Sequence, residues 1–337
     1  MKIVGWAQST AGQGRYRIGL PMWALGVAGH ETFTFDPNNI AFPADLDVLV
    51  GQIVIDDQST EVWQQLAARD DRPALVLELD DDVWSVEADN PAHAYFSDPG
   101  RQANLIRNIE VADAVTVSTA RLAEIVGAYN PHVTVVPNCV DISLLSRPTP
   151  ANHRVVVGWA GGHSHRLDLY AAGEPLRRFF RRNPQVDAHL MGTDYRGVIG
   201  RPHARYTPWT SEFADYYRNL DFDIGIAPLR ATDFNAAKSD LKFLEYSALG
   251  IATVASNFGP YAESIEHGVT GFLVTQPSDW GKYLRLLAND PALREQIAWN
   301  ARQWAATRTI HGNYGRWELV YEQALARARG TEVVPAA

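Results

Sequence analysis

The chain has 337 residues, of which 46% are hydrophobic and 20% charged, and its formal net charge is −9. This composition excludes a disordered polymer, and the length predicts about two domains, each with its own core. We find no apolar run near the roughly 20 residues that a bilayer-spanning helix needs, and the N-terminus lacks the long apolar core of a signal peptide. Cys139 is the only cysteine, which excludes an internal disulfide and a cysteine-cluster zinc site, so we expect a cytoplasmic protein.

Charge is distributed unevenly along the chain. Residues 1–150 hold 9 Lys and Arg against 20 Asp and Glu, a net of −11, whereas residues 151–337 hold 21 against 19, a net of +2. A net acidic chain is a poor general binder of nucleic acid, whose phosphates favour a basic surface. If the protein holds a phosphate-bearing ligand, the second half is the better host.

Short β-rich runs alternate with helix-length segments from end to end. The strands predicted in the first half are 2–7, 32–35, 48–54, 74–79, 114–117 and 133–136. Crossover helices are predicted between them at 15–28, 60–69 and 119–128. Apolar strands separated by helices indicate a parallel sheet that is covered on both faces.

A segment with Pro148 and Pro150, at 146–153, interrupts this pattern and predicts a linker. The alternation then resumes, with strands at 154–159, 187–191, 222–226 and 252–255 and helices at 279–288, 291–306 and 314–327. We therefore predict an α/β protein with two doubly wound, Rossmann-like domains, 1–147 and 153–310, which face each other across a cleft. A C-terminal helix over 311–330 is expected to pack back on the first domain.

The most specific signal lies at 222–274, where a strand opens into a polar loop and then a helix. The helix is predicted to begin near Ser239 and Asp240, residue types that cap helix N-termini, and such a terminus is an anion site.

Three side chains of this segment suit a nucleotide diphosphate. Lys238, Lys242 and Glu245 are spaced i, i+4, i+7 and are predicted to share one helical face. The cations supply charge for the phosphates, and the carboxylate is an acceptor for ribose hydroxyls. An ordinary surface ion pair of Lys242 and Glu245 is the alternative.

The segment 222–274 resembles part of a known protein family. The string LEYSALGIATVAS, followed by Gly259, Glu263, Gly268 and Gly271, resembles the donor-binding half of GT-B glycosyltransferases of retaining family 4, the group 1 transferases. The resemblance implies a GT-B fold and a metal-independent hexosyl-type transferase without a cofactor. Its co-substrate would be a nucleotide-diphosphate sugar, and its acceptor an unidentified hydroxyl.

The resemblance also implies roles for single residues. Glu245 would bind the ribose hydroxyls, and Lys238 or Lys242 would neutralise the diphosphate. The first Glu of the family's motif, which contacts the donor sugar, is replaced here by Ala237, so the sugar contacts would come from Asn235, Asp233 or Asp240. The donor-site residues predicted from this segment are Asn235, Lys238, Ser239, Asp240, Leu241 and Glu245.

Two further segments are candidates for donor binding. Gly161 and Gly162 form a tight turn after a strand and allow an anion to approach the backbone, and His163 can donate a hydrogen bond to it. A plain β–α connection with an exposed histidine is the alternative. The resemblance places the nucleotide base beside a loop at Thr207 and Trp209, where Trp209 would stack on the base unless it is a core tryptophan.

The first strand is followed by a GxG turn formed by Gly12 and Gly14. This turn is too little for a dinucleotide fingerprint, and Asp36 after the second strand is the one sign of a Rossmann dehydrogenase. In the resembling family a glycine-rich loop at this place reaches toward phosphate and acceptor. Arg15, Tyr16 and Arg17 would then supply side chains, the first two to the acceptor.

Asp80, Asp81 and Asp82 follow the buried strand at 74–79. We predict that they line the acceptor pocket, with Asp81 as a catalytic candidate beside Lys238 and Lys242. A solvated run of charge is one alternative, and a metal site of the GT-A type is another. The repeated α/β pattern argues against GT-A.

The predicted function is therefore transfer of a sugar with retention, the leaving diphosphate being stabilised by lysine and a helix N-terminus. Two other functions stay open. The missing Glu at position 237 suggests a non-catalytic GT-B-like partner module, and a nucleotide-sugar 2-epimerase would act without an acceptor.

Overall fold

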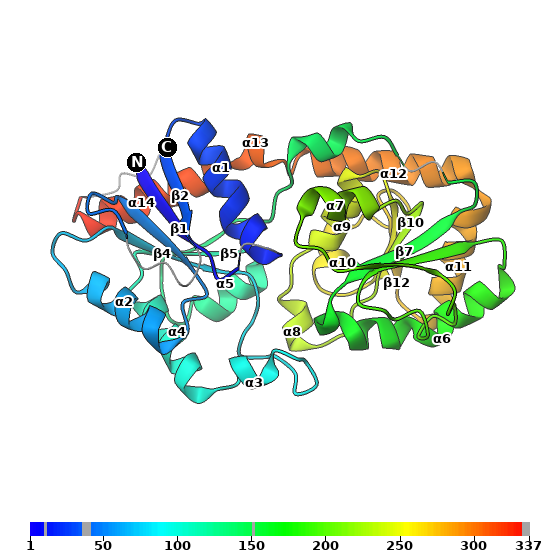
Figure 1. The fold of residues 1–337 in the computed structure, drawn as a ribbon, viewed down its shortest axis with the longest axis horizontal. Coiled ribbons are helices and arrows are strands. Elements are labelled where there is room, and N and C mark those ends of the chain that lie inside the picture. Colours follow the sequence, from blue (N-terminus) through cyan, green and yellow to red (C-terminus); the bar gives the residue numbers. More distant parts are fainter. Residues whose placement is uncertain (10–11, 36–41, 150–151, 332–337) are drawn as a thin grey trace. The chain divides into compact units, whose positions relative to one another are not determined.

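The structure is a computed structural model that describes residues 1–9, 12–35, 42–149 and 152–331. It divides into two compact α/β units (Figure 1). The first comprises Met1–Cys139, Ala237–Ser239 and Ile310–Ala337, and the second Val140–Ala236 and Asp240–Thr309. This division differs from the ranges expected from the sequence at 140–147, which group with the second unit, and at 237–239. Asp36, named as a sign of a dehydrogenase, and Pro150 of the predicted linker lie outside the described residues.

The first unit contains a six-stranded sheet in the order β2-β1-β3-β4-β5-β6, with all its neighbours paired in parallel. Its strands are β1 (Lys2–Trp6), β2 (Glu31–Phe35), β3 (Val48–Gln52), β4 (Ala74–Leu79), β5 (Ala114–Val117) and β6 (Val133–Val135). Strands β3, β4 and β5 are buried along their whole length, as expected for strands that are covered on both faces.

The helices of the first unit are η1 (Arg15–Gly19), α1 (Leu20–Val27), α2 (Asp57–Ala67), α3 (His93–Phe96), α4 (Pro99–Glu110), α5 (Ala120–Val126), α13 (Ile310–Asn313) and α14 (Gly315–Ala328). The π-helical turn η1 runs directly into α1, where Pro21 cannot donate a backbone hydrogen bond. Helix α4, which the sequence analysis did not predict, begins where Asp98 accepts a hydrogen bond from the Arg101 N–H. Helix α14 contacts β3, β4 and β5 and covers one face of the sheet there.

The second unit also has six parallel strands, in the order β12-β11-β10-β7-β8-β9. They are β7 (Val156–Gly161), β8 (Asp187–Gly192), β9 (Arg205–Pro208), β10 (Ile224–Ala227), β11 (Ala252–Ser256) and β12 (Phe272–Val274). The helices are η2 (Ile142–Ser146), η3 (His163–His165), α6 (Arg166–Arg182), α7 (Phe213–Asn219), α8 (Asp233–Ala236), α9 (Leu241–Ala248), α10 (Pro260–Ser264), α11 (Pro277–Asn289) and α12 (Pro291–Ala306).

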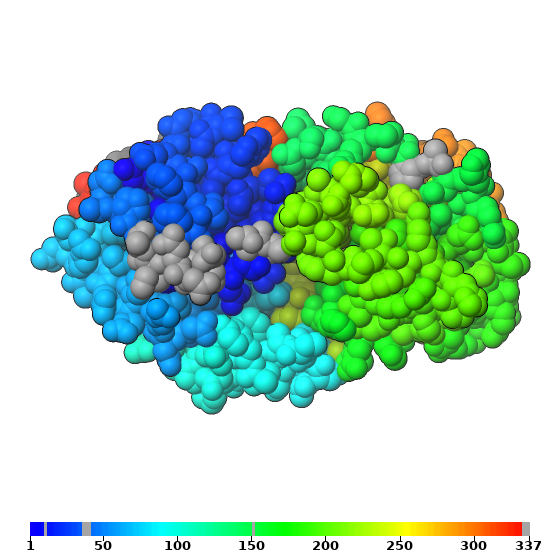
Figure 2. Space-filling model, in the orientation of Figure 1, coloured from blue at the N-terminus to red at the C-terminus, as the bar shows by residue number. Residues whose placement is uncertain are grey.

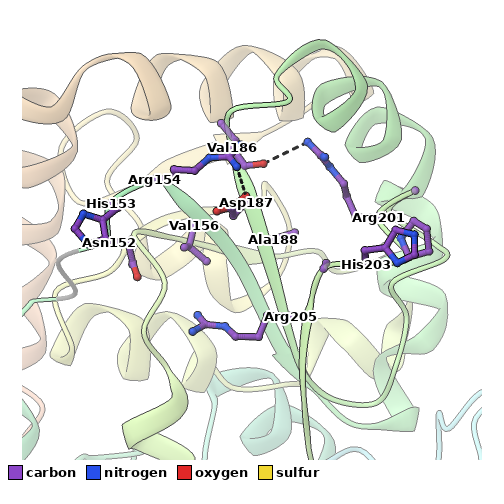
Figure 3. Close-up of a pocket in the computed structure, with 13 residues that line it drawn as sticks. Asn152, His153, Arg154, Val156, Val186, Asp187, Ala188, Arg201, His203 and Arg205 are labelled. Carbon is purple, nitrogen blue, oxygen red and sulfur yellow. Dashed lines mark hydrogen bonds and ion pairs between the residues drawn. The ribbon is translucent and has the colours of Figure 1, made fainter.

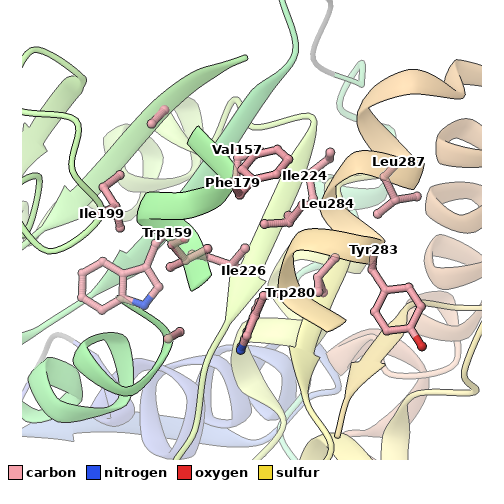
Figure 4. Close-up of a cluster of buried hydrophobic side chains, with 14 of the residues drawn as sticks. Val157, Trp159, Phe179, Ile199, Ile224, Ile226, Trp280, Tyr283, Leu284 and Leu287 are labelled. Atoms are coloured by element: carbon pink, nitrogen blue, oxygen red, sulfur yellow. The ribbon is translucent and has the colours of Figure 1, made fainter. Parts of the chain in front are cut away.

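The core of the second unit lies between its sheet and the covering helices (Figure 4). Trp159 of β7, Ile224 of β10 and Leu284 of α11 are each at most 2% exposed. Small residues permit this packing: a Cβ on Gly225 of β10 would lie 2.5 Å from the ring of Tyr246 on α9. Among the described residues, no helix combines the length and the apolar character needed to cross a membrane.

The strand orders locate a switch point in each sheet. In the second unit, β8 and β9 follow β7 on one side, and β10 to β12 lie on its other side, so the direction of winding reverses between β7 and β10. The first sheet reverses between β1 and β3. Ligands of open α/β sheets bind at such points, beyond the carboxyl ends of the strands. The loops that follow β7, β10, β1 and β3 are therefore the candidate binding regions of the two units.

Candidate functional site

The turn that follows β7 lies at the switch point of the second unit. A Cβ on Gly161 would press against the Trp159 ring at 2.5 Å, so the fold itself requires glycine there. Gly162 is different, because no atom of the described residues would lie within 4 Å of a Cβ at this position. The side chain of His163 is exposed. The turn thus has open space at Gly162 and a hydrogen-bonding side chain beside it.

Asp168, in the first turn of α6, joins this turn to the loop that follows β10. Its Oδ1 accepts hydrogen bonds from the Arg230 N–H and the Asn235 Nδ2, both at 2.9 Å, and its Oδ2 lies 3.0 Å from His165 Nδ1. Burial opposes ionisation of Asp168, but His165 and these donors together hold its pKa below the ordinary value. The side-chain amide of Asn235, which was predicted to contact the donor sugar, is instead hydrogen-bonded to Asp168 and the Arg230 carbonyl. Sequence reasoning missed Asp168, since no local pattern marks a carboxylate whose partners are 62 and 67 residues away.

Glu245 lies on α9 and is 4% exposed. The hydroxyl of Tyr216, on α7, donates a hydrogen bond to its Oε2 at 3.0 Å. Burial and the neighbouring Glu245 raise the pKa of Tyr216 well above the ordinary value, so the phenol keeps its proton. The ring of Trp209, which is 55% exposed, lies 6.3 Å from the Tyr216 ring. The structure therefore links Glu245, which was predicted to accept hydrogen bonds from the ribose hydroxyls, to Trp209, which was predicted to stack on the base. The link is Tyr216, which the sequence analysis did not select.

Thr207 does not lie in a loop, so that part of the prediction is wrong. It belongs to the strand β9, where it pairs with Met191 of β8. Its hydroxyl is 2.8 Å from Nε2 of the buried His189, whose Nδ1 is 3.0 Å from Asp221. Pairing with β8 and the contact with His189 hold this side chain in the sheet. Trp209 lies just beyond the strand.

Helix α9 begins at Leu241, one residue after the predicted start, and Asp240 makes no side-chain capping hydrogen bond. Its carboxylate instead lies 3.2 Å from Nη1 of Arg308 and accepts a hydrogen bond from the Ser264 hydroxyl at 2.7 Å. The expectation that Asp240 caps the helix is therefore wrong, because a long-range ion pair takes the carboxylate. Lys242 lies in the first turn of α9.

The prediction that Lys238 shares a helical face with Lys242 and Glu245 is also wrong. Residues 237–239 precede the helix and are held by the first unit: Thr119 donates to the Ala237 carbonyl, and Asn138 donates to the Ser239 hydroxyl, both at 2.9 Å. The Lys238 Nζ lies 3.0 Å from Asp81 Oδ1. Ala237 itself is fully buried in the core of the first unit.

The three consecutive aspartates after β4 have different environments. Burial, and next the charges of Asp81 and Glu78, raise the pKa of Asp80 to about 8, and its Oδ1 is buried without a hydrogen-bond partner among the described residues. Asp81 pairs with Lys238. Asp82 is 2% exposed, and its Oδ1 accepts a hydrogen bond from the Trp84 N–H at 3.1 Å. The structure thus groups Asp80, Asp81 and Lys238, whereas Asp82 shapes the turn.

The segment after β1 does not offer the side chains that were expected of a loop. Gly12 has a φ of +56°, and a Cβ on Gly14 would collide with the carbonyl oxygen of Ser9. Tyr16 and Arg17 are buried because they lie in η1 and face the core, and Arg17 is fully buried.

Arg17 is paired within the first unit. Its Nε lies 2.6 Å from Oε1 of Glu78, and its Nη1 donates to the Val136 carbonyl. The expectation that Arg17 reaches toward a ligand is therefore wrong. Arg15, by contrast, is partly exposed.

A hollow of about 660 Å³ opens at the opposite edge of the second sheet, beside the amino ends of β7 and β8 (Figure 3). Two of the arginines that line it are engaged in ion pairs: Arg154 lies 3.3 Å from Asp187, and Arg205 pairs with Asp221. Because parallel sheets bind ligands at their carboxyl ends, this hollow is not the candidate donor site.

Comparison with known proteins bears on this geometry. Residues 241–304 match the family model described as "Glycosyl transferases group 1". A curated relative, D-inositol 3-phosphate glycosyltransferase from Thermobispora bispora, is 31% identical over 127 residues, which are 37% of this chain and 28% of the relative. The chain thus matches less than a third of that relative's length.

Solved structures match over nearly the whole chain. Sucrose-phosphate synthase from Thermosynechococcus elongatus has a TM-score of 0.71 at 15% identity, covering 97% of this chain and 100% of that one. HepE from Anabaena, solved in complex with UDP, has a TM-score of 0.66 at 16% identity, covering 96% and 100%. The chain has the GT-B fold with two Rossmann-like units, and its resemblance to the group 1 glycosyltransferases is confirmed.

Proposed function

We propose that the chain is a retaining glycosyltransferase that moves a sugar from a nucleotide-diphosphate sugar to an acceptor hydroxyl. The observation that carries the proposal is the match of 241–304 to the group 1 family, because this segment contains Glu245 on α9 and the whole of β11 and α10. Structures of HepE with UDP and with UDP-glucose support a nucleotide sugar as the donor.

In this proposal the donor nucleotide occupies the carboxyl edge of the second sheet. Trp209 stacks on the base, and Glu245 accepts hydrogen bonds from the ribose hydroxyls. The Tyr216 hydroxyl holds one oxygen of Glu245 at 3.0 Å, so the carboxylate is oriented before the ligand arrives. The open backbone at Gly162 and the exposed His163 are placed for the diphosphate.

The reaction exchanges one bond to the anomeric carbon for another. The bond to the diphosphate oxygen breaks, the acceptor oxygen forms the new bond on the same face, and the acceptor's proton passes to the leaving diphosphate. Negative charge grows on that diphosphate, and Lys242, Lys238 and the N-terminus of α9 are proposed to stabilise it. Asp81, whose Oδ1 lies 3.0 Å from the Lys238 Nζ within the first unit, stays the proposed catalytic carboxylate. Metal independence remains a prediction, and turnover measured with and without a chelator tests it.

One observation favours a second candidate, the non-catalytic partner module. The position where the resembling family places a sugar-contacting Glu is the fully buried Ala237. A carboxylate could not be charged there without a large desolvation cost. If no other residue replaces that contact, the chain binds nucleotide but does not turn over.

A donor screen followed by product analysis separates these functions. A thermal-shift screen of UDP- and GDP-sugars with the full chain identifies the donor, because a specific ligand raises the melting temperature. Proton NMR of that donor with a panel of sugar acceptors should then show free nucleotide diphosphate and a new glycoside with the donor's anomeric configuration. A 2-epimer formed without acceptor would indicate the epimerase. Donor binding without any diphosphate release would favour the partner module.

A further inference from the structure

The hollow of about 660 Å³ beside the amino ends of β7 and β8 is rich in cationic side chains. None of the site residues predicted from the sequence is among its described lining residues. Helix α6 and the segment that leads from β8 to β9 lie at the surface of the second unit in the view of Figure 2 (green). The ionisable side chains that line the hollow are those of Arg154, Arg201, Arg205, His153, His203 and Asp187.

Two guanidinium groups converge on the turn that joins α6 to β8. Arg154 Nε donates to the Gln185 carbonyl at 2.8 Å. Arg201 Nη2 donates to the carbonyl of the next residue, Val186, at 3.3 Å, and Figure 3 shows both arginines beside this turn. A single carboxylate joins them among the described lining residues, that of Asp187, which lies 3.3 Å from Arg154 Nη1. The two arginines therefore carry one positive charge more than this carboxylate balances.

Arg201 is the arginine whose charge is not balanced. Its Nη2 also donates to the carbonyls of Phe180 and Asn183 at the end of α6, at 2.9 and 3.2 Å, but it pairs with no carboxylate of the described chain. The Arg201 Nε is buried and has no hydrogen-bond partner within the described ranges. Because buried donors of a charged group are almost always paired, this N–H indicates an anionic acceptor that the hollow receives.

Arg205 adds a second guanidinium from the amino end of β9. Its side chain is exposed, and its Nη2 pairs with Asp221. That carboxylate is shared, because its Oδ1 also lies 3.0 Å from Nδ1 of the buried His189. His203, two residues before Arg205, is exposed as well. Both side chains are therefore accessible to a ligand in the hollow.

The segment that carries Arg201 and His203 is ordered before a ligand arrives. Gly200 has a φ of +69° and packs on α6, since a Cβ there would lie 2.9 Å from Cγ of Arg177. The Arg201 N–H donates to the Arg196 carbonyl at 3.0 Å, which closes the turn. Side chains that are already positioned lose less conformational entropy on binding.

We propose that this hollow binds the phosphate group of a small phosphate monoester, with Arg201, Arg205 and His203 donating hydrogen bonds to its oxygens. Guanidinium groups match the oxygens of a phosphate, and the dianion supplies the negative charge that the arginines lack. Pockets of about 300–1,000 Å³ hold drug-sized ligands, so the hollow also has room for the organic part of the ester. This binding does not depend on the transfer reaction, because the hollow lies at the amino ends of the strands.

The binding is tested by isothermal titration of the full chain with ribose 5-phosphate, ribose and citrate as probes. Ribose 5-phosphate should bind the wild type, ribose should not, and citrate should bind more weakly than the phosphate. Arg201→Gln should weaken the binding of ribose 5-phosphate at least tenfold. Arg285→Gln is the matched control, because Arg285 is an exposed arginine of α11 outside the lining of the hollow.

Two further variants keep the test decisive, because Arg201→Gln also removes hydrogen bonds at the end of α6. His203→Glu places a negative charge at an exposed position and should weaken binding at least tenfold, while its melting temperature stays near that of the wild type. Glu245→Ala should leave the affinity for ribose 5-phosphate unchanged, because α9 does not line the hollow.

Four results would overturn the proposal. They are no binding of ribose 5-phosphate to the wild type, equal binding of ribose or citrate, wild-type affinity in the folded His203→Glu variant, and loss of binding in Glu245→Ala. The last of these would place the phosphate at the carboxyl edge of the sheet.

Discussion

Asp80 shows how strongly its surroundings alter a side chain at the end of β4. Its pKa rises from 3.8 to about 8, first because of burial and then because of the charges of Asp81 and Glu78. A carboxyl group with this pKa is protonated at neutral pH and can donate a hydrogen bond. Beside Lys238 and Asp81, Asp80 is therefore a neutral carboxylic acid and not a charged carboxylate.

This pKa predicts how stability depends on pH. The folded state binds the Asp80 proton more tightly than the unfolded state, so wild-type stability falls as the pH rises from about 4 to 8. Asp80→Asn removes this loss, which is on the order of a few kcal/mol at pH 8. Urea unfolding at pH 5 and pH 8.5 measures it, with Asp71→Asn, whose side chain is 81% exposed, as the control. An equal pH dependence in wild type and Asp80→Asn would refute the shifted pKa.

Asp168 should behave in the opposite way. Its folded pKa lies below the ordinary 3.8, so its stabilisation is present above that value and is lost as the pH falls through the folded pKa. Asp168→Asn should cost about 1.5–3 kcal/mol at pH 7, because hydrogen bonds to a charged group are lost. The difference should shrink below pH 4. Asp233→Asn, an exposed change on α8, is the control, and urea unfolding is the measurement.

At the scale of residues, the sequence could predict those site residues that belong to a recognisable motif. Glu245 and Trp209 were selected from one segment each, and the structure joins them through Tyr216. Tyr216 and Asp168 could not be selected, because Glu245 is 29 residues from Tyr216, and Arg230 and Asn235 are 62 and 67 residues from Asp168. Lys238 was assigned to the wrong face because spacing assumes a helix, whereas its segment is held by Asn138 and Thr119.

At the scale of elements, most strands were predicted from their apolar runs, and two short ones were missed. The bounds of β4 and β5 agree with the predicted ranges because both are short apolar runs buried on both faces. Strands β9 and β12 were not predicted, since β9 is a four-residue segment with exposed ends and β12 has three residues. Their place depends on pairing with β8 and β11, which no local pattern encodes.

Two glycines of the second unit should differ in what they contribute. Gly225→Ala should destabilise the protein by about 1–3 kcal/mol, because its Cβ would overpack against Tyr246. Gly162→Ala should leave stability within about 0.5 kcal/mol, since the space is open. If the turn approaches the diphosphate, Gly162→Ala should nevertheless weaken UDP binding at least tenfold. Thermal melting and calorimetric titration of both variants test this pair, and wild-type UDP affinity in Gly162→Ala would contradict the assigned role of the turn.

At the scale of the whole molecule, the first unit is built from separate parts of the chain. Helix α14 covers β3, β4 and β5 with Trp317 and Tyr321, both fully buried. Burying each of these side chains stabilises the unit by about 1.5–3 kcal/mol. Residue Arg17 lies 5.9 Å from the Trp317 ring, so the helix also closes the buried ion pair with Glu78.

A fragment of residues 1–139 should therefore fail to unfold cooperatively in urea. The same fragment joined to 310–331 by a flexible linker should regain a cooperative transition, because the covering helix is restored. Circular dichroism during urea titration distinguishes the two. A cooperative transition of 1–139 alone would show that the helix is dispensable for this unit.

The central claim is that the carboxyl edge of the second sheet binds a nucleoside diphosphate through Glu245. Isothermal titration of the full chain with UDP and with GDP tests it most directly. One of the two should bind at a single site, Glu245→Ala should weaken that binding at least tenfold, or about 1.4 kcal/mol, and the exposed change Glu266→Gln should leave it unchanged. No heat with either nucleotide, or the same affinity in Glu245→Ala and wild type, would contradict the claim.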